Sequence, residues 1–272
     1  MRNFIRAVFF TIAFLMTAGL PVRADENRPE FGKYFDRHQV IGTFVLYDQN
    51  DKKFIRYNPE RARKGFVPAS TFKIANSLIG LETGIITGED YVFKWNGEKR
   101  LLDIWNRDLS LNRAFNSSCL PCYQGLAREI GHERMKKWVK KLKYGNADIS
   151  GGIDQFWLTG GLRISADEEV EFLRRLYNSK LPLKQTTMDT VKKIMLREDN
   201  GKYKLSYKTG WQTDDLKNSI GSKSLGWIVG YLETGGNVHY FATNIETDDT
   251  RADFAASRME ITRQILKDLK LL

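Results

Sequence analysis

The chain has 272 residues, of which 42% are hydrophobic and 28% charged, and its formal net charge at pH 7 is +10. This composition suits one large domain or two interlocked domains with a good core. Two cysteines and the singly scattered His38, His132 and His239 exclude a zinc site by number and spacing.

The first 24 residues have the pattern of a secretory signal peptide. Arg2 and Arg6 precede an apolar run at residues 7–20, and small residues allow cleavage after Ala24. The run is shorter than the roughly 20 residues that span a bilayer, and no later stretch is long enough. We therefore expect secretion to the periplasm rather than the alternative of an uncleaved anchor, with no transmembrane span in the mature chain.

Strand patterns lie at both ends of the expected mature chain. Residues 42–47 and 53–57 are rich in strand formers around a turn-prone segment, which predicts a hairpin. Residues 204–211, 225–233 and 238–246 predict three more strands, the last two joined at Gly235 and Gly236. Residues 225–232 and 238–245 are apolar at most positions, so we expect a sheet that is covered on both faces.

The middle of the chain has a helical pattern from residue 68 to about residue 197. It includes segments from Ser70 onward and at 123–130, 133–142 and 165–179, the last with a capping box of Ser165 and Glu168. An amphipathic helix at 252–270 suits one face of the sheet. The prediction is an α+β fold, an antiparallel sheet flanked by terminal helices with an inserted all-helical region.

The expected domain organisation is a single catalytic unit over residues 25–272. Residues 25–65 and about 198–272 would form a sheet subdomain, and about 66–197 a mainly helical one.

Two local features allow more than one interpretation. Five lysines between residues 136 and 143 flank apolar residues, which indicates the solvated face of an amphipathic helix or, alternatively, a patch for an anionic polymer. We favour the former and expect no nucleic-acid partner. Cys119 and Cys122 form a C-x-x-C motif. It is either a redox site or a structural pair, and a structural pair could be a disulfide or two small apolar residues. The sequence does not settle the redox state of the two cysteines.

The candidate chemistry begins with Ser70 and Lys73, which share a helix face at a spacing of three. A serine hydroxyl needs an adjacent base, and no histidine stands in a recognisable triad context. A lysine can act as that base if an apolar pocket lowers its pKa. Four further triplets follow in order: Ser118-Cys119-Leu120, Tyr144-Gly145-Asn146, Phe156-Trp157-Leu158 and Lys208-Thr209-Gly210.

This ordered set resembles the class D, oxacillinase-type serine β-lactamases, from about Gly42 to the C-terminus. The resemblance implies the fold shared with penicillin-binding transpeptidases, and hydrolysis of penicillin- and cephalosporin-type β-lactams. Leu120 stands where the class A enzymes and penicillin-binding proteins carry the asparagine of S-x-N. Class D enzymes usually have valine there, so Leu120 departs from both patterns.

The resemblance also assigns catalytic roles. Ser70 is the acylated nucleophile and N-carboxylated Lys73 the general base for acylation and deacylation, which needs carbon dioxide or bicarbonate but no other cofactor. Trp157 donates its indole N–H to the carbamate, and Ser118 passes a proton to the leaving nitrogen. The backbone N–H groups of Ser70 and Trp211 form the oxyanion hole.

Substrate-binding roles are implied for Lys208, Thr209, Gly210, Arg258, Leu120 and Leu158. Lys208, Thr209 and Arg258 would hold the substrate carboxylate, with Arg251 as the rival arginine. Leu120 and Leu158 would line the lysine pocket with Phe72. Tyr144, Gly145 and Asn146 would shape the wall of the site.

Three rivals remain: a penicillin-binding peptidase, a β-lactam sensor domain that stays acylated, and an interaction protein that uses the basic helix. The pattern predicts neither an oligomeric state nor a substrate spectrum.

Overall fold

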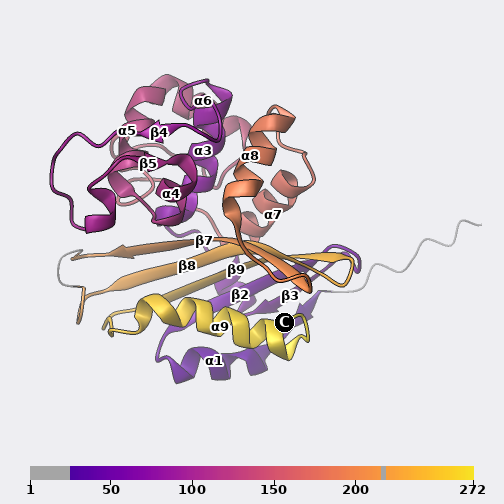
Figure 1. Cartoon of the computed structure of the whole chain (residues 1–272). Coiled ribbons are helices and arrows are strands. Elements are labelled where there is room, and N and C mark those ends of the chain that lie inside the picture. Colours follow the sequence, from indigo (N-terminus) through magenta and orange to yellow (C-terminus); the bar gives the residue numbers. More distant parts are fainter. Residues whose placement is uncertain (1–24, 216–218) are drawn as a thin grey trace, which may run out of the picture.

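The computed structural model describes residues 25–215 and 219–272, so the predicted signal peptide lies outside the described residues. A seven-stranded sheet with the order β1-β3-β2-β9-β8-β7-β6 divides the molecule into two halves. Figure 1 shows the region of α3 to α8 over one face of this sheet and α1 and α9 against the other. This is the α+β architecture that the sequence predicts.

The N-terminal and C-terminal strands meet in the middle of the sheet. Phe44 and Val45 in β2 face Thr243 and Ala242 in β9, so segments almost two hundred residues apart become neighbours. The strands are β1 (Glu26–Asn27), β2 (Ile41–Asp48), β3 (Lys53–Tyr57), β6 (Leu196–Asp199), β7 (Tyr203–Thr213), β8 (Ser224–Thr234) and β9 (Asn237–Thr247). All neighbours are antiparallel except β1 and β3, which pair in parallel over two residues that the sequence analysis did not assign to a strand.

The predicted hairpins are confirmed. β2 and β3 pair directly, and β8 and β9 are joined through Gly235 and Gly236, whose φ angles are 57° and 74°. Such angles fall in the left-handed region that glycine reaches without the penalty of a Cβ. β8 and β9 are buried along most of their length, as their continuous apolar patterns predict.

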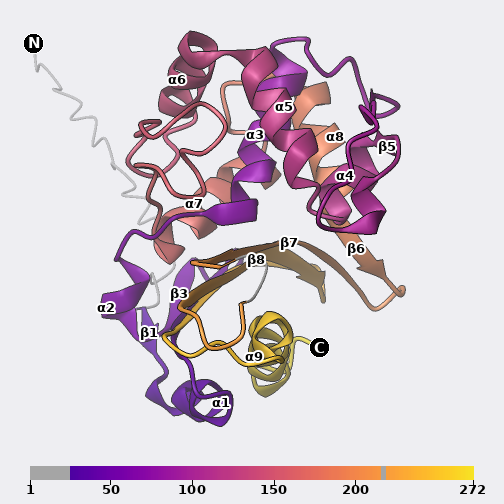
Figure 2. The ribbon, with the colours of Figure 1, turned by 90° about the vertical axis from the view of Figure 1, so that its left-hand side faces the viewer.

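Two hydrophobic cores lie on opposite faces of the sheet. Side chains alternate along β2. Val45 points into the core between the sheet and the helical region, whereas Phe44 and Leu46 point into the core between the sheet and helices α1 and α9, here called the lower core. The turned view in Figure 2 shows both layers edge-on, with α9 and α1 below the curved sheet. The central strands of the sheet are therefore packed on both faces.

The helices are α1 (Gly32–Arg37), α2 (Pro59–Ala62), α3 (Lys73–Glu82), α4 (Leu111–Asn116), α5 (Leu120–Ile130), α6 (His132–Lys141), α7 (Ala166–Tyr177), α8 (Gln185–Met195) and α9 (Phe254–Asp268). Three 3₁₀ turns, Pro29–Phe31, Ala69–Phe72 (η2) and Asp103–Trp105, and a small sheet of β4 (Val92–Phe93) and β5 (Leu109–Ser110) complete the described fold. The small sheet was not predicted.

The capping box predicted for α7 is present, whereas the start of α5 differs from the prediction. At α7, Ser165 accepts from the backbone N–H of Glu168, and the Glu168 carboxylate accepts from the backbone N–H of Ser165. α5 begins three residues earlier than predicted, because Cys119 caps it and Pro121 stands in its first turn.

The five lysines of the basic segment are exposed, while Met135, Val139 and Leu142 are buried. This is the arrangement of a solvated amphipathic helix. Across residues 25–215 and 219–272, no helix has the length and apolarity needed to cross a membrane. The same residues hold no cluster of three histidine, cysteine, aspartate or glutamate side chains suited to a metal ion.

We expect Ile265→Ala in α9 to lower the free energy of unfolding by about 2–5 kcal/mol, because it leaves a cavity in the lower core. Ile41→Ala is the matched control, since Ile41 is 66% exposed, and should change stability by about 0.5 kcal/mol or less. Urea unfolding measures both. Equal losses in the two variants would contradict the two-core description.

Candidate active site

The proposed nucleophile lies in the short turn η2, which leads directly into α3. Ala69, the residue before Ser70, has a φ of +50°, a left-handed conformation that is strained for a residue with a Cβ. The backbone N–H of Ala69 donates to the carbonyl of Trp157 at 2.9 Å. The turn is thus fastened to the segment that carries the Phe156-Trp157-Leu158 motif, and Ser70 remains half-buried at its surface.

Lys73 begins α3 and lies next to Ser70. Its Nζ donates to Ser70 Oγ at 2.8 Å, its side chain is fully buried, and its ammonium lies 5.3 Å from the centroid of the Tyr123 ring. Burial disfavours the charged form and lowers the pKa of Lys73 to about 7. A substantial fraction of the lysine is therefore neutral near pH 7 and able to accept a proton.

Trp157 is also fully buried, and its ring stacks on Phe72 with centroids 5.4 Å apart. The indole Nε1 has no hydrogen-bond partner among the described residues. The indole of Trp157 is therefore not bonded to the backbone of any described residue. An unpaired buried N–H costs about 1–3 kcal/mol, so the environment of Trp157 suits an added acceptor.

Lys208 of β7 joins the second serine to the site. Its Nζ donates to Ser118 Oγ and, at 2.8 Å, to the carbonyl of Thr209. Ser118 has a φ of +52°, so a second strained residue stands in the site. The two residues are ninety positions apart in the chain and meet because β7 passes beneath the start of α5.

Three further basic side chains lie near Lys208. Burial lowers the pKa of Lys208 well below its usual value, and the nearby charges of Lys73, Arg197 and Arg258 lower it further. Arg197, which the sequence analysis did not single out, lies 5.2 Å from the Tyr207 ring and donates to the Asn116 carbonyl. An anionic ligand would stabilise the charged forms of these basic groups, so the set favours an anion.

Gly210 lets β7 lie directly against the nucleophile turn. A Cβ on Gly210 would stand 2.9 Å from the carbonyl oxygen of Pro68 and 3.2 Å from Thr71 Cγ2. Trp211 follows, with its indole N–H bonded to Ser224 Oγ at 3.1 Å and its ring near Phe254 on the other face. The backbone between them is therefore held close to Ser70.

The two candidate arginines differ sharply in environment. Arg258, on α9, is buried, donates from Nη1 to the carbonyl of Gly210, and has no partner for Nε among the described residues. Burial lowers the pKa of Arg258 to about 10. Arg251 is exposed and donates to Gln39 at 2.6 Å. Of the two, only Arg258 touches the strand that carries Lys208.

The structure places the other predicted site residues on α5, on β7 and after Trp157. Leu120 is the half-buried first residue of α5, and Thr209 is half-buried on β7. Leu158 lines a cleft of about 320 Å³ with Gly65 and Phe66. A ring next to the lysine ammonium belongs to Tyr123, which the sequence analysis did not single out and which the helical spacing from Leu120 could have indicated.

The Tyr144-Gly145-Asn146 motif supports the site from behind. The Tyr144 hydroxyl donates to Glu169 at 2.9 Å. A Cβ on Gly145 would stand 2.0 Å from the carbonyl of Arg163, and Asn146 bonds the backbone of Gly161 and Arg163. The motif therefore ties down the loop that ends in α7.

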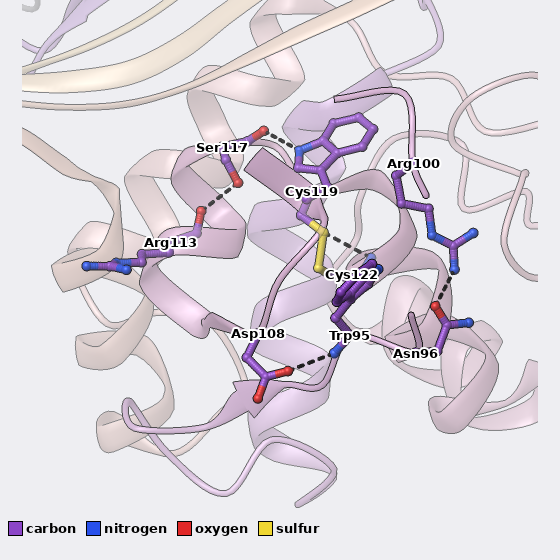
Figure 3. The surroundings of a disulfide bond; sticks show 9 residues. Trp95, Asn96, Arg100, Asp108, Arg113, Ser117, Cys119 and Cys122 are labelled. Carbon is purple, nitrogen blue, oxygen red and sulfur yellow. Dashed lines mark hydrogen bonds between the residues drawn. A yellow bond between two sulfur atoms is a disulfide. The ribbon is translucent and has the colours of Figure 1, made fainter. Parts of the chain in front are cut away.

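The two cysteines form a disulfide beside Ser118, so they are bonded rather than simply apolar. Figure 3 shows this bond at the start of α5, close to Ser117. The indole N–H of Trp105 donates to the Ser117 carbonyl at 3.1 Å. A cleft of about 390 Å³ lies next to it, lined in part by Phe93, Trp105 and Cys122. The bond closes the segment between the two residues, Leu120 among them.

Known proteins resemble this chain over nearly its whole length. Residues 42–267 match the family model of the penicillin-binding protein transpeptidase domain. The chain is 41% identical to β-lactamase OXA-48 of Klebsiella pneumoniae, with 100% of each chain covered. Among solved structures, class D β-lactamase YbXI from Nostoc has 45% identity and a TM-score of 0.82, covering 89% of this chain and 99% of its own. FUS-1 (OXA-85), a class D β-lactamase from Fusobacterium nucleatum subsp. polymorphum, has 41% identity and a TM-score of 0.83, covering 91% and 100%.

We expect Lys73→Met to make stability less dependent on pH. The wild-type lysine loses its proton at about pH 7 in the folded state and at 10.5 when unfolded. Folding therefore becomes less favourable by about 1.4 kcal/mol for each pH unit below 10.5, until about pH 7, and is constant below that. The variant should gain free energy of unfolding at pH 7 but little at pH 10.

Thermal or urea unfolding at both pH values, in buffer without bicarbonate, measures this gain. The exposed Lys180 provides the control Lys180→Met, which should give no such difference. A Lys73→Met gain of equal size at pH 7 and pH 10 would show that the wild-type lysine is not buried in its charged form.

Proposed function

Because this chain belongs to the class D β-lactamases, we propose that it opens the amide of penicillin- and cephalosporin-type β-lactams through an acyl-enzyme on Ser70. The enzyme is a β-lactamase hydrolase by its family. The observation that carries the finer assignment is the contact of Ser70 Oγ with the buried Lys73 Nζ at 2.8 Å. A lysine with a pKa of about 7 at that distance is a competent base for a serine.

In acylation, Ser70 Oγ attacks the carbonyl carbon of the β-lactam. The Ser70 proton passes to the base on Lys73 as the O–C bond forms; the C–N bond of the ring then breaks, and the nitrogen leaves with a proton from the Ser118 hydroxyl. The hydrogen bond from Lys208 to Ser118 supports this route, because the carboxylate of a bound substrate would favour the charged form of Lys208, which can then replace the proton. The backbone N–H groups of Ser70 and Trp211 would bind the oxyanion, and the close approach of Gly210 to Pro68 favours that pairing.

Lys73 is proposed to act after reaction with carbon dioxide. The carbamate would supply a carboxylate base that serves both acylation and hydrolysis of the acyl-enzyme. The residues fit such a group. With a pKa of about 7, Lys73 supplies the neutral amine that reacts with carbon dioxide. The unpaired indole N–H of Trp157 and the hydroxyl of Ser70 can donate hydrogen bonds to the carbamate. Carbon dioxide or bicarbonate would be the only accessory requirement.

The carboxylate of the substrate is proposed to bind at Lys208, Thr209 and Arg258. The cluster of basic side chains around Lys208 supports an anion at this point, and Arg258 already contacts Gly210 in the same strand. Arg251 is disfavoured, because it is exposed and bonded to Gln39. Leu120 and Leu158 would contribute only to the apolar surroundings of the substrate.

Secretion to the periplasm is part of the proposal. It rests on the signal-peptide pattern of residues 1–24, which lie outside the described structure.

The alternative is a protein that is acylated by β-lactams but does not turn over, as a sensor domain or a penicillin-binding peptidase. The match to the transpeptidase family model is the observation that keeps this candidate. The apolar Leu120, at the place of the S-x-N asparagine, counts against a peptidase. Multiple turnovers distinguish the two candidates.

We expect the mature protein to hydrolyse a chromogenic cephalosporin over many turnovers. The rate should fall when carbon dioxide is removed and recover with bicarbonate, because Lys73 must be carboxylated. Lys73→Ala should lower kcat by roughly a thousandfold or more, and bicarbonate should not restore it. Lys180→Ala, at an exposed lysine, is the matched control.

A stoichiometric burst without further product would favour the acylated sensor or peptidase instead. Full turnover by Lys73→Ala, or turnover indifferent to bicarbonate, would contradict the role of the carboxylated lysine. Mass spectrometry of the protein with a slow substrate tests the covalent step, since the added mass should lie on the peptide that contains Ser70.

A further inference from the structure

A buried carboxyl group lies directly behind the nucleophile turn and has no part in the chemistry above. Glu169, in the first turn of α7, is fully buried. Its Oε1 accepts two hydrogen bonds, from Thr71 Oγ1 at 2.7 Å and from the Tyr144 hydroxyl at 2.9 Å. Its Oε2 has no hydrogen-bond partner among the described residues. An acid in this setting is bound through one oxygen only.

The surroundings of Glu169 favour its neutral form. Burial raises the pKa of Glu169 to about 7, the nearby carboxylate of Glu168 raises it, and the hydroxyls of Thr71 and Tyr144 lower it. These are the groups that act on the carboxyl, and none is a cation. Tyr144 is itself buried, with a pKa raised well above its usual value, so it stays a donor throughout the neutral range.

The hydrogen bond to Thr71 connects this acid to the nucleophile. Thr71 follows Ser70 within η2, and its hydroxyl also lies 2.9 Å from the carbonyl of Pro68 at the start of the turn. Phe72 packs edge-on against Tyr144 with centroids 5.6 Å apart. One carboxyl oxygen therefore joins α7, the Tyr144 motif and the turn that presents Ser70, which contains the strained Ala69.

We propose that Glu169, as a neutral acid, is a positioning residue for the reaction at Ser70. Its Oε1 holds the hydroxyls of Thr71 and Tyr144 and so keeps the turn at Ala69–Phe72 in the geometry from which Ser70 attacks. When Glu169 loses its proton, a charge without a cationic partner stands in a dry site, and the turn relaxes as the site opens to solvent. This inference rests on the proposed role of Ser70 as nucleophile.

The reaction step that reports this role is acylation of Ser70. It is measured in single turnover by stopped flow, with enzyme in excess over a chromogenic cephalosporin, from pH 5.5 to 9. Wild-type protein should show a narrow bell-shaped profile centred near pH 7, with a rising limb from Lys73 and a falling limb from Glu169, because both pKa values are about 7. Glu169→Gln keeps the acceptor oxygen but cannot ionise, so its acylation rate should stay within roughly threefold of wild type while the falling limb disappears.

Glu169→Leu removes the acceptor and should slow acylation by roughly tenfold or more at every pH, because the turn loses its anchor. Thr71→Val removes the donor on the turn and should also slow acylation. The combined Thr71→Val and Glu169→Leu variant should be slower than Glu169→Leu by less than the effect of Thr71→Val alone, since the two changes share the hydrogen bond between Thr71 and Glu169. If Glu169→Leu does not fold, Thr71→Val alone decides the question.

Glu168→Gln is the matched control, because Glu168 is the exposed neighbouring acid and glutamine also serves in a capping box. It should leave the rate at low pH and the presence of the falling limb unchanged. The limb itself should move to slightly lower pH, because the Glu168 carboxylate raises the pKa of Glu169. A Glu169→Leu or Thr71→Val variant that acylates at the wild-type rate would show that Glu169 serves stability alone. A Glu169→Gln variant as slow as Glu169→Leu would show that the acceptor oxygen is not what matters.

The two levels of the proposal fail in different ways. If wild-type protein gains no mass on the Ser70 peptide, the proposed function is wrong, whatever the Glu169 variants do. If wild-type Ser70 is acylated and the falling limb persists in Glu169→Gln, only the role of Glu169 is wrong.

Discussion

The burial of Lys73 against Ser70, without a carboxylate beside it, is the constraint on which the rest of the site depends. A charged lysine in a dry interior is costly unless a counter-ion neutralises it, so the site favours the neutral amine. That same amine is what a serine needs as a base and what carbon dioxide needs as a partner. The chemistry proposed here therefore follows from how α3 is packed rather than from an unusual residue.

Two layers must meet to create that environment. Ser70 and Lys73 belong to the helical side, whereas Lys208, Gly210 and Trp211 belong to the sheet. The absence of a side chain at Gly210 lets the two layers touch at Pro68. Because β7 is held in the sheet by β8, and β8 by β9, the position of the strand that carries Lys208 depends on the whole antiparallel core.

The strained residues of the site need support from outside it. Ala69 and Ser118 both adopt left-handed backbone conformations, each beside a reacting group. Ala69 is tied to Trp157, and Ser118 adjoins the disulfide between Cys119 and Cys122. The hydrogen bonds from Thr71 and Tyr144 to Glu169 add a third support. The strained turn at Ser70 is thus held by hydrogen bonds to Trp157 and Glu169, and the strained Ser118 lies next to a covalently closed segment.

Local patterns in the sequence determined much of this protein. The hairpins, the capping box of α7, the amphipathic α6 and α9, and the order of the S-x-x-K, YGN, FWL and KTG motifs are all set by neighbours a few residues apart, so the α+β class and the family could be inferred from them. Only the tertiary structure decided that Tyr123 lies at Lys73, that Arg258 rather than Arg251 contacts β7, that the two cysteines are bonded, and that Glu169 accepts from Thr71. Apart from the bond between the cysteines, each of these contacts joins segments about fifty to a hundred residues apart. Nothing in the local spacing encodes such a pairing, because it depends on how the helical region docks on the sheet.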